Sequence, residues 1–112
     1  HAPLTEKTKG IINRDSISLM KKTAYLINTA RGGFVNEADL RDTLDSGKIA
    51  GYAADTVFDE PMSKDNPLLG AKNCLITPHI AWAATETRQR LLDIVVKNLH
   101  CYIEGKPQNV VT

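Results

Sequence analysis

The sequence predicts a parallel α/β sheet with crossover helices, followed by a long C-terminal helix. Short apolar runs at residues 24–28, 49–56 and 74–76 alternate with segments of helical character, and that order is typical of a parallel sheet. The longest periodic segment, residues 85–104, repeats apolar residues at helical spacing and carries charges on its other face. These observations place most of the chain in one sheet-containing domain.

Local signals define the first half of this fold. Asn13 is a good N-cap and predicts a short helix that runs to about Met20. The run 24–28 is apolar without polar alternation, which is typical of a strand covered on both faces. Asn36 is expected to cap a second helix over residues 37–46.

Local signals also define the second half of the fold. The strand expected within 49–56 is rich in small residues, which favours a helix or a cofactor packed close against it. Residues 57–72 contain many turn formers and predict a long loop. The strand at 74–76 should end before Pro78, because proline cannot donate to a sheet ladder.

Composition excludes several classes of protein. The 112 residues are 42% hydrophobic and 24% charged, with a net charge of +1, so we expect no nucleic-acid or membrane partner. Cys74 and Cys101 are far apart and favour core cysteines of a reduced, cytoplasmic protein. The scattered histidines predict no metal site.

The chain does not begin with Met, so we expect a fragment, a processed chain or a partial sequence.

Each apolar run is followed by a turn that carries one ionisable group. These groups are Arg31, Glu60 and His79. Taken singly, each has an ordinary interpretation as a solvated arginine, a surface carboxylate or a structural histidine. In open α/β sheets, however, ligands bind outside the carboxyl ends of the strands. The three side chains could therefore form one site.

The chemistry of these groups is complementary. An arginine fork binds a carboxylate, and the adjacent Gly32 and Gly33 would permit positive φ and close approach of a ligand. A carboxylate such as Glu60 beside His79 would fix the tautomer of the ring and favour its charged form. Such a histidine can give a proton to a carbonyl oxygen during reduction of a 2-keto acid.

Reduction also needs a hydride source, and no side chain supplies one, so a nicotinamide cofactor is implied. Asp55 ends the second strand. It either caps the turn or lies against the nicotinamide end of that cofactor.

The motifs resemble those of the NAD-dependent, D-isomer-specific 2-hydroxyacid dehydrogenases. The matching phrases are HAPLT at 1–5, NTARGG at 28–33, ADTVFDEP at 54–61, DNPLL at 65–69 and TPHIAW at 77–82. Within that family, DNPLL, Trp82 and residues 88–93 look most like glycerate dehydrogenases, also called hydroxypyruvate reductases. Thr56 stands where valine is usual, and we expect this departure to be tolerated.

The resemblance implies roles for individual residues. Arg31 would bind the substrate carboxylate, Glu60 would partner the histidine, and His79 would act as acid and base. The cofactor would be NAD, with NADP as the alternative. The residues implied to lie at or near it are Thr29, Ala30, Asp55, His79, His1 and Thr5.

The resemblance also implies the organisation of the chain. Residues 1–84 would form the second half of a Rossmann-like NAD(P)-binding domain, and 85–112 a long helix and tail returning toward a substrate domain. No G-x-G-x-x-G occurs, and it would lie upstream. The intact protein is expected to be a homodimeric oxidoreductase acting on a small 2-keto or 2-hydroxy acid, and the 112-residue piece alone is expected to be inactive. The alternative is a nucleotide-binding scaffold or corepressor-like protein of the same fold.

Overall fold

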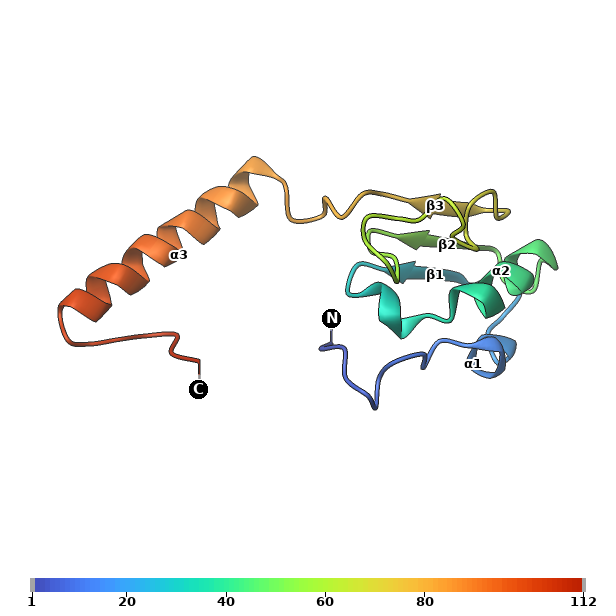
Figure 1. Ribbon diagram of the computed structural model, residues 1–112, viewed down its shortest axis with the longest axis horizontal. Helices are drawn as coiled ribbons and strands as arrows, with labels where there is room; N and C mark the ends of the chain where they lie inside the picture. The colour runs from blue at the N-terminus through green and yellow to red at the C-terminus, as the bar shows by residue number, and fades with distance from the viewer. Residues whose placement is uncertain (1, 112) are drawn as a thin grey trace. The chain divides into compact units, whose positions relative to one another are not determined.

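The computed structural model describes residues 2–111 and forms two compact units, one ending at His79 and the other beginning at Ile80. The first unit contains a three-stranded sheet in the order β1-β2-β3, with both pairings parallel (Figure 1). Its strands are β1 (Tyr25–Asn28), β2 (Gly51–Ala54) and β3 (Cys74–Ile76). The predicted parallel α/β architecture is confirmed, and β3 has the predicted bounds.

The first helix, α1 (Arg14–Ser18), begins at the predicted cap. The Asn13 side chain accepts hydrogen bonds from the backbone N–H groups of Asp15 and Ser16. The Ser16 hydroxyl accepts in return from the Asn13 N–H, which completes a capping box. The helix ends two residues before Met20, so the prediction was slightly too long.

The second helix, α2 (Glu37–Asp45), is also capped as predicted, because the Asn36 side chain accepts from the Asp39 N–H. A single 3₁₀ turn, η1 (Gly32–Phe34), lies between β1 and α2 and was not predicted. Gly47 follows α2 in a left-handed conformation, with φ of +68°, as expected for a helix-ending glycine.

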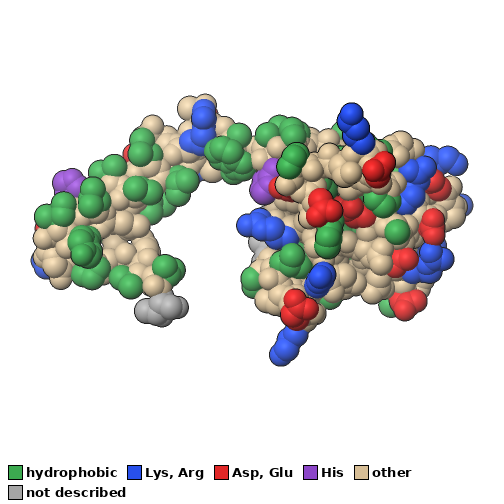
Figure 2. All heavy atoms as spheres, in the orientation of Figure 1, with side chains coloured by type: hydrophobic (Ala, Val, Ile, Leu, Met, Phe, Trp, Pro, Cys, Tyr) green, Lys and Arg blue, Asp and Glu red, His purple; other side chains and the backbone are tan. Residues whose placement is uncertain are grey.

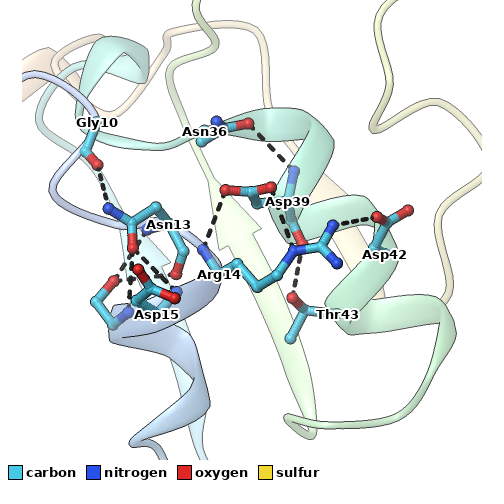
Figure 3. A network of polar contacts seen from close by, with 9 residues as sticks. Gly10, Asn13, Arg14, Asp15, Asn36, Asp39, Asp42 and Thr43 are labelled. Carbon is cyan, nitrogen blue, oxygen red and sulfur yellow. Dashed lines mark hydrogen bonds and ion pairs between the residues drawn. The ribbon is translucent and has the colours of Figure 1, made fainter.

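A polar junction joins α1 to α2 (Figure 3). The Arg14 backbone N–H donates to Asp39, and its guanidinium donates to Asp42 at 2.6 Å. The Thr43 hydroxyl donates to the Asp39 carbonyl one turn earlier. The Arg14–Asp42 pair is largely exposed and contributes little stability by itself. Together with the Asp39 contact, it links the start of α1 to α2.

The core lies on one face of the sheet. Its fully buried side chains come from both helices and from the segment leading into β2, and they are Ile17, Leu40, Leu44 and Ile49. Tyr52 and Ala54 of β2 face the same cluster, with Leu26 and Ile76 packed against it. The helices therefore cover the face of the sheet that carries these residues.

The other face of the sheet is open among the described residues. Tyr25 and Ile27 of β1 are 75% and 69% exposed, and Leu75 of β3 is 65% exposed. The prediction that β1 is covered on both faces is therefore wrong for this unit. The physical reason is that α1 and α2 pack against the opposite face, where alternation along the strand places Leu26 and Asn28.

The second unit contains one long helix, α3 (Thr85–Ile103), within one residue of its predicted range. None of its residues is buried in the described chain, and hydrophobic side chains gather along it (Figure 2). Gly105, with φ of +72°, follows its C-terminal end. Within residues 2–111 no helix combines the length and apolar character needed to cross a membrane.

Candidate active site at the carboxyl edge of the sheet

The ionisable residues predicted to form a site all follow the carboxyl ends of strands. Arg31 comes three residues after β1, Asp55 directly after β2, and His79 three residues after β3. Glu60 lies in the loop that follows β2. Because the strands are parallel and their arrows in Figure 1 point the same way, these turns share one edge of the sheet.

His79 and Glu60 form a direct pair. The ring Nδ1 of His79 donates to Glu60 Oε2 at 2.7 Å, and Glu60 Oε1 accepts from the Val57 N–H at 3.1 Å. The hydrogen bond from His79 is the main cause that holds the pKa of Glu60 below its usual range, and the Val57 N–H adds to it. Because the carboxylate binds Nδ1, it fixes the orientation of the imidazole ring.

The backbone at His79 adopts an uncommon conformation. Its φ is +54°, in the left-handed region that few non-glycine residues occupy. The His79 N–H donates to the Thr77 carbonyl at 3.0 Å, which closes a tight turn directly after β3. The strand and this turn together direct the ring toward Glu60, and the side chain remains 43% exposed. Such backbone conformations concentrate at functional sites.

A buried asparagine shapes the turn that carries Arg31. Asn28 Oδ1 accepts from the Ala30 N–H at 3.0 Å, and Asn28 Nδ2 donates to the Arg31 carbonyl at 2.9 Å. The Arg31 guanidinium donates to the Ala30 carbonyl at 2.7 Å. Arg31 also contributes to the lowered pKa of Glu60 through its charge, so the two turns lie in one electrostatic environment. The sequence motif contains Asn28, but its bracing role was not predicted.

The glycines after Arg31 have a different role from the one predicted. Neither Gly32 nor Gly33 has a positive φ. A Cβ on Gly32 would lie 1.9 Å from the Val57 carbonyl carbon and 2.3 Å from the Phe58 nitrogen, and one on Gly33 would lie 2.6 Å from the Leu4 side chain. The interpretation that they clear room for a ligand is wrong, because the protein's own chain fills that space.

Asp55 is buried at the end of β2, with 5% of its surface exposed. Its N–H donates to the Asn28 carbonyl at 2.9 Å, and the Thr77 hydroxyl donates to its carboxylate. Asp55, Glu60 and His79 line a cavity of about 510 Å³, which is otherwise mainly apolar. The structure thus brings the Glu60–His79 pair and a buried carboxylate to one cavity.

The remaining predicted cofactor residues divide into two groups. Thr29 and Ala30 line a hollow of about 610 Å³ together with Arg31 and with residues 2–4. Thr5 is exposed, and its N–H donates to the Thr8 hydroxyl, so its polar groups are engaged within their own turn. His1 lies outside the described residues.

Within residues 2–111, no cluster of three or more His, Cys, Asp or Glu side chains could hold a metal ion.

Comparison with known proteins identifies this arrangement. Residues 1–81 match the model of the D-isomer specific 2-hydroxyacid dehydrogenase, NAD binding domain. The chain belongs to this family. The predicted resemblance is confirmed, and Arg31, Asp55, Glu60 and His79 all fall inside the matched NAD-binding domain.

Several members of the D-isomer specific 2-hydroxyacid dehydrogenase family resemble the chain over nearly its whole length. A hydroxypyruvate reductase from Blautia hydrogenotrophica is 51% identical over 99% of this chain and 34% of its own. A glycerate dehydrogenase from Methylorubrum extorquens is 47% identical over 99% of this chain and 36% of its own. The chain therefore spans about a third of the length of these curated relatives.

Solved structures agree on the fold. An NADPH-dependent glyoxylate/hydroxypyruvate reductase from Sinorhizobium meliloti, solved with citrate, is 34% identical with a TM-score of 0.83. The match covers 97% of this chain and 35% of that one. The predicted Rossmann-like fold and the NAD-binding, oxidoreductase character of the family are thus confirmed.

Proposed function

We propose that the complete protein reduces a small 2-keto acid, such as hydroxypyruvate or glyoxylate, to the 2-hydroxy acid with NADH or NADPH. The observation that carries this proposal is the 2.7 Å pair of His79 and Glu60, at the same sheet edge as Arg31. A proton donor and a carboxylate binder at one edge are what this reaction requires. The names of the relatives from Blautia hydrogenotrophica and Methylorubrum extorquens favour hydroxypyruvate and glycerate as the substrate pair.

The residues at the edge fit a nicotinamide cofactor. The hollow beside Thr29 and Ala30 is lined at these two positions by short side chains, which leave room for a flat ring. Asp55, buried at the end of β2, offers a fixed carboxylate to a polar group of such a ring. We assign Thr29, Ala30 and Asp55 to cofactor binding, and when bound the nicotinamide supplies the hydride. His1 and Thr5 stay predictions.

Each member of the Arg31, Glu60 and His79 set has a distinct role in the proposed reaction. The planar guanidinium of Arg31 pairs with the substrate carboxylate and orients the 2-keto group. Nε2 of His79 would give a proton to the carbonyl oxygen of the substrate as that oxygen gains negative charge during reduction. Glu60 holds Nδ1 and so fixes the orientation of the ring for this transfer. In the reverse direction, Nε2 takes the proton back.

The family match also supports a proposal for the organisation of the complete protein. We assign residues 1–84 to the NAD(P)-binding domain and 85–112 to a helix and tail that return toward a substrate domain. The complete protein is expected to be a homodimer in the cytoplasm. Both cysteines of the described chain, Cys74 and Cys101, are free thiols, which suits a reducing compartment.

Arg31→Ala in the complete protein tests the substrate assignment. Loss of a bidentate carboxylate contact should lower kcat/KM for hydroxypyruvate by about 100-fold and raise its KM, because the substrate loses its main ionic contact. The Kd for NADH should change by less than about twofold.

Arg14→Ala is the matched control, since Arg14 pairs with Asp42 at the junction of α1 and α2. An unchanged KM for hydroxypyruvate in Arg31→Ala would remove Arg31 from the substrate site. NADH binding by the wild type without turnover of any 2-keto acid would favour the nucleotide-binding scaffold instead.

A further inference from the structure

Glu37 bridges two parts of the loop that carries Glu60. It is the first residue of α2, and its Oε1 accepts from the Phe58 N–H at 2.8 Å. Its Oε2 accepts from Asn66 Nδ2 at 2.7 Å. Asn66 is itself buried, and its oxygen accepts from the Leu68 N–H at 2.8 Å. Both carboxylate oxygens of Glu37 are thus engaged with residues 21 and 29 positions away in sequence.

The Phe58 amide is a specific point of attachment. Phe58 adjoins Val57, whose own N–H donates to Glu60 Oε1. On the other side, the backbone of Gly32, next to Arg31, lies directly against the Val57–Phe58 peptide. The contact of Glu37 therefore fixes the Val57–Phe58 peptide against the turn of Arg31. The N–H that holds Glu60 belongs to the adjoining peptide, on the other side of the Val57 Cα.

We propose that Glu37 is a positioning residue, which acts through Phe58 and Val57 to hold Glu60 at His79 and to hold the Val57–Phe58 peptide against the Arg31 turn. The catalytic part of this inference rests on the proposed reductase function. Glu37 does not contact the reacting atoms in this account. It sets the geometry of the residue that orients the proton donor.

The simpler alternative is that Glu37 merely anchors a surface loop. The same loop has a second anchor on α2, which allows the positioning role to be distinguished from simple anchoring. Arg41, one turn further along α2, donates to the carbonyls of Pro67 and Leu69 at 2.9 and 2.8 Å. Arg41 thus holds the distal part of the loop, away from Glu60 in sequence. Loss of either anchor should reduce the stability of the loop. Only loss of Glu37 should disturb the position of Glu60.

Kinetics of the complete protein provide the first test, with hydroxypyruvate and NADH as substrates. Glu37→Ala should lower kcat by at least about tenfold, because the lost hydrogen bonds involve a charged group. Glu37→Gln keeps one acceptor oxygen for the Phe58 N–H and should recover part of this loss. Arg41→Gln should lower the Tm to a similar degree and change kcat by less than about twofold.

A double-mutant cycle separates positioning from general stability. In a Glu60→Gln background, Glu37→Ala should change kcat by less than about twofold, because its effect passes through Glu60. An equal loss of kcat in both backgrounds would overturn the proposal, and so would a wild-type kcat in Glu37→Ala.

Proton NMR tests the same inference without turnover. The Nδ1–H of His79, bonded to a carboxylate, should give a downfield ring resonance, which is assigned by its loss in His79→Gln. This resonance should shift or vanish in Glu37→Ala, change less in Glu37→Gln, and persist in Arg41→Gln. A wild-type resonance in a folded Glu37→Ala variant would overturn the proposal. If the wild-type protein reduces no 2-keto acid, the reductase function fails, and the resonance alone decides the role of Glu37.

Discussion

The carboxylate of Glu60 accepts hydrogen bonds from the His79 ring and from the Val57 backbone. These bonds favour the ionised form, which is why its pKa is lowered in the folded protein. A carboxyl group with a lowered pKa stabilises the fold above its unfolded pKa. That contribution is lost as the pH falls through the folded value.

Glu60→Gln should therefore lower the Tm at pH 7, and the difference from wild type should shrink in acid. The difference should disappear well below about pH 4, where the wild-type carboxyl is also neutral. Thermal unfolding of both proteins from pH 7 to pH 3 measures it. A Tm difference that stays constant across this range would show that the pair with His79 is not an ionised contact.

Thr56 differs from Glu60, because its buried hydroxyl group lacks a hydrogen-bond partner in the described part of the chain. It is 3% exposed, and its hydroxyl has no hydrogen-bond partner among the described residues. Burial of an unpaired hydroxyl is unfavourable, and valine has nearly the same shape. Thr56→Val should raise the free energy of unfolding by about 1 kcal/mol. Urea denaturation would show this as a higher midpoint with an unchanged slope, whereas a lower midpoint would mean that the hydroxyl has a partner.

At the scale of elements, the close contact of η1 with the loop after β2 links the Arg31 turn to the Glu60 turn. Gly32→Ala should force these backbones apart and cost about 3 kcal/mol, because the new methyl group meets main-chain atoms. Gly47→Ala is the comparison, since Gly47 has a positive φ but no neighbour within 4 Å, and it should cost about 1 kcal/mol. Equal destabilisation of the two variants would contradict the steric role of Gly32.

The elements that sequence patterns located were those with local causes. Asn13 and Asn36 begin helices because their side chains cap the following turns, and β3 is a short apolar run before a proline. The bridge of Glu37 to Phe58 and Asn66 had no such signal. It joins residues that are distant in sequence, so one sequence without its fold cannot indicate it. The role of Gly32 was misjudged for the same reason.

The pairing of His79 with Glu60 is an intermediate case. The parallel order of strands placed both residues at one edge of the sheet, and their chemistry favoured a pair. The orientation of the His79 ring depends on a left-handed φ and on the turn at Thr77, neither of which the sequence indicated.

At the scale of the whole molecule, large apolar surfaces remain open in the described chain. They include one sheet face, with Tyr25, Ile27 and Leu75, and separately the side chains along α3. Exposed patches of this kind promote association. A polypeptide of these 112 residues should therefore self-associate, and Ile27→Lys should weaken the association. Sedimentation velocity measures this, and a stable monomer at high concentration would contradict the prediction.

Steady-state oxidation of NADH by hydroxypyruvate, compared between the complete protein and its His79→Gln variant, tests most directly whether this sheet edge reduces 2-keto acids. The wild type should turn over. The variant should lose about 1,000-fold in kcat, because the carbonyl oxygen loses its proton donor. Its Kd for NADH should change by less than about twofold. A variant that turns over hydroxypyruvate at the wild-type rate would contradict the assignment of His79 as the proton donor.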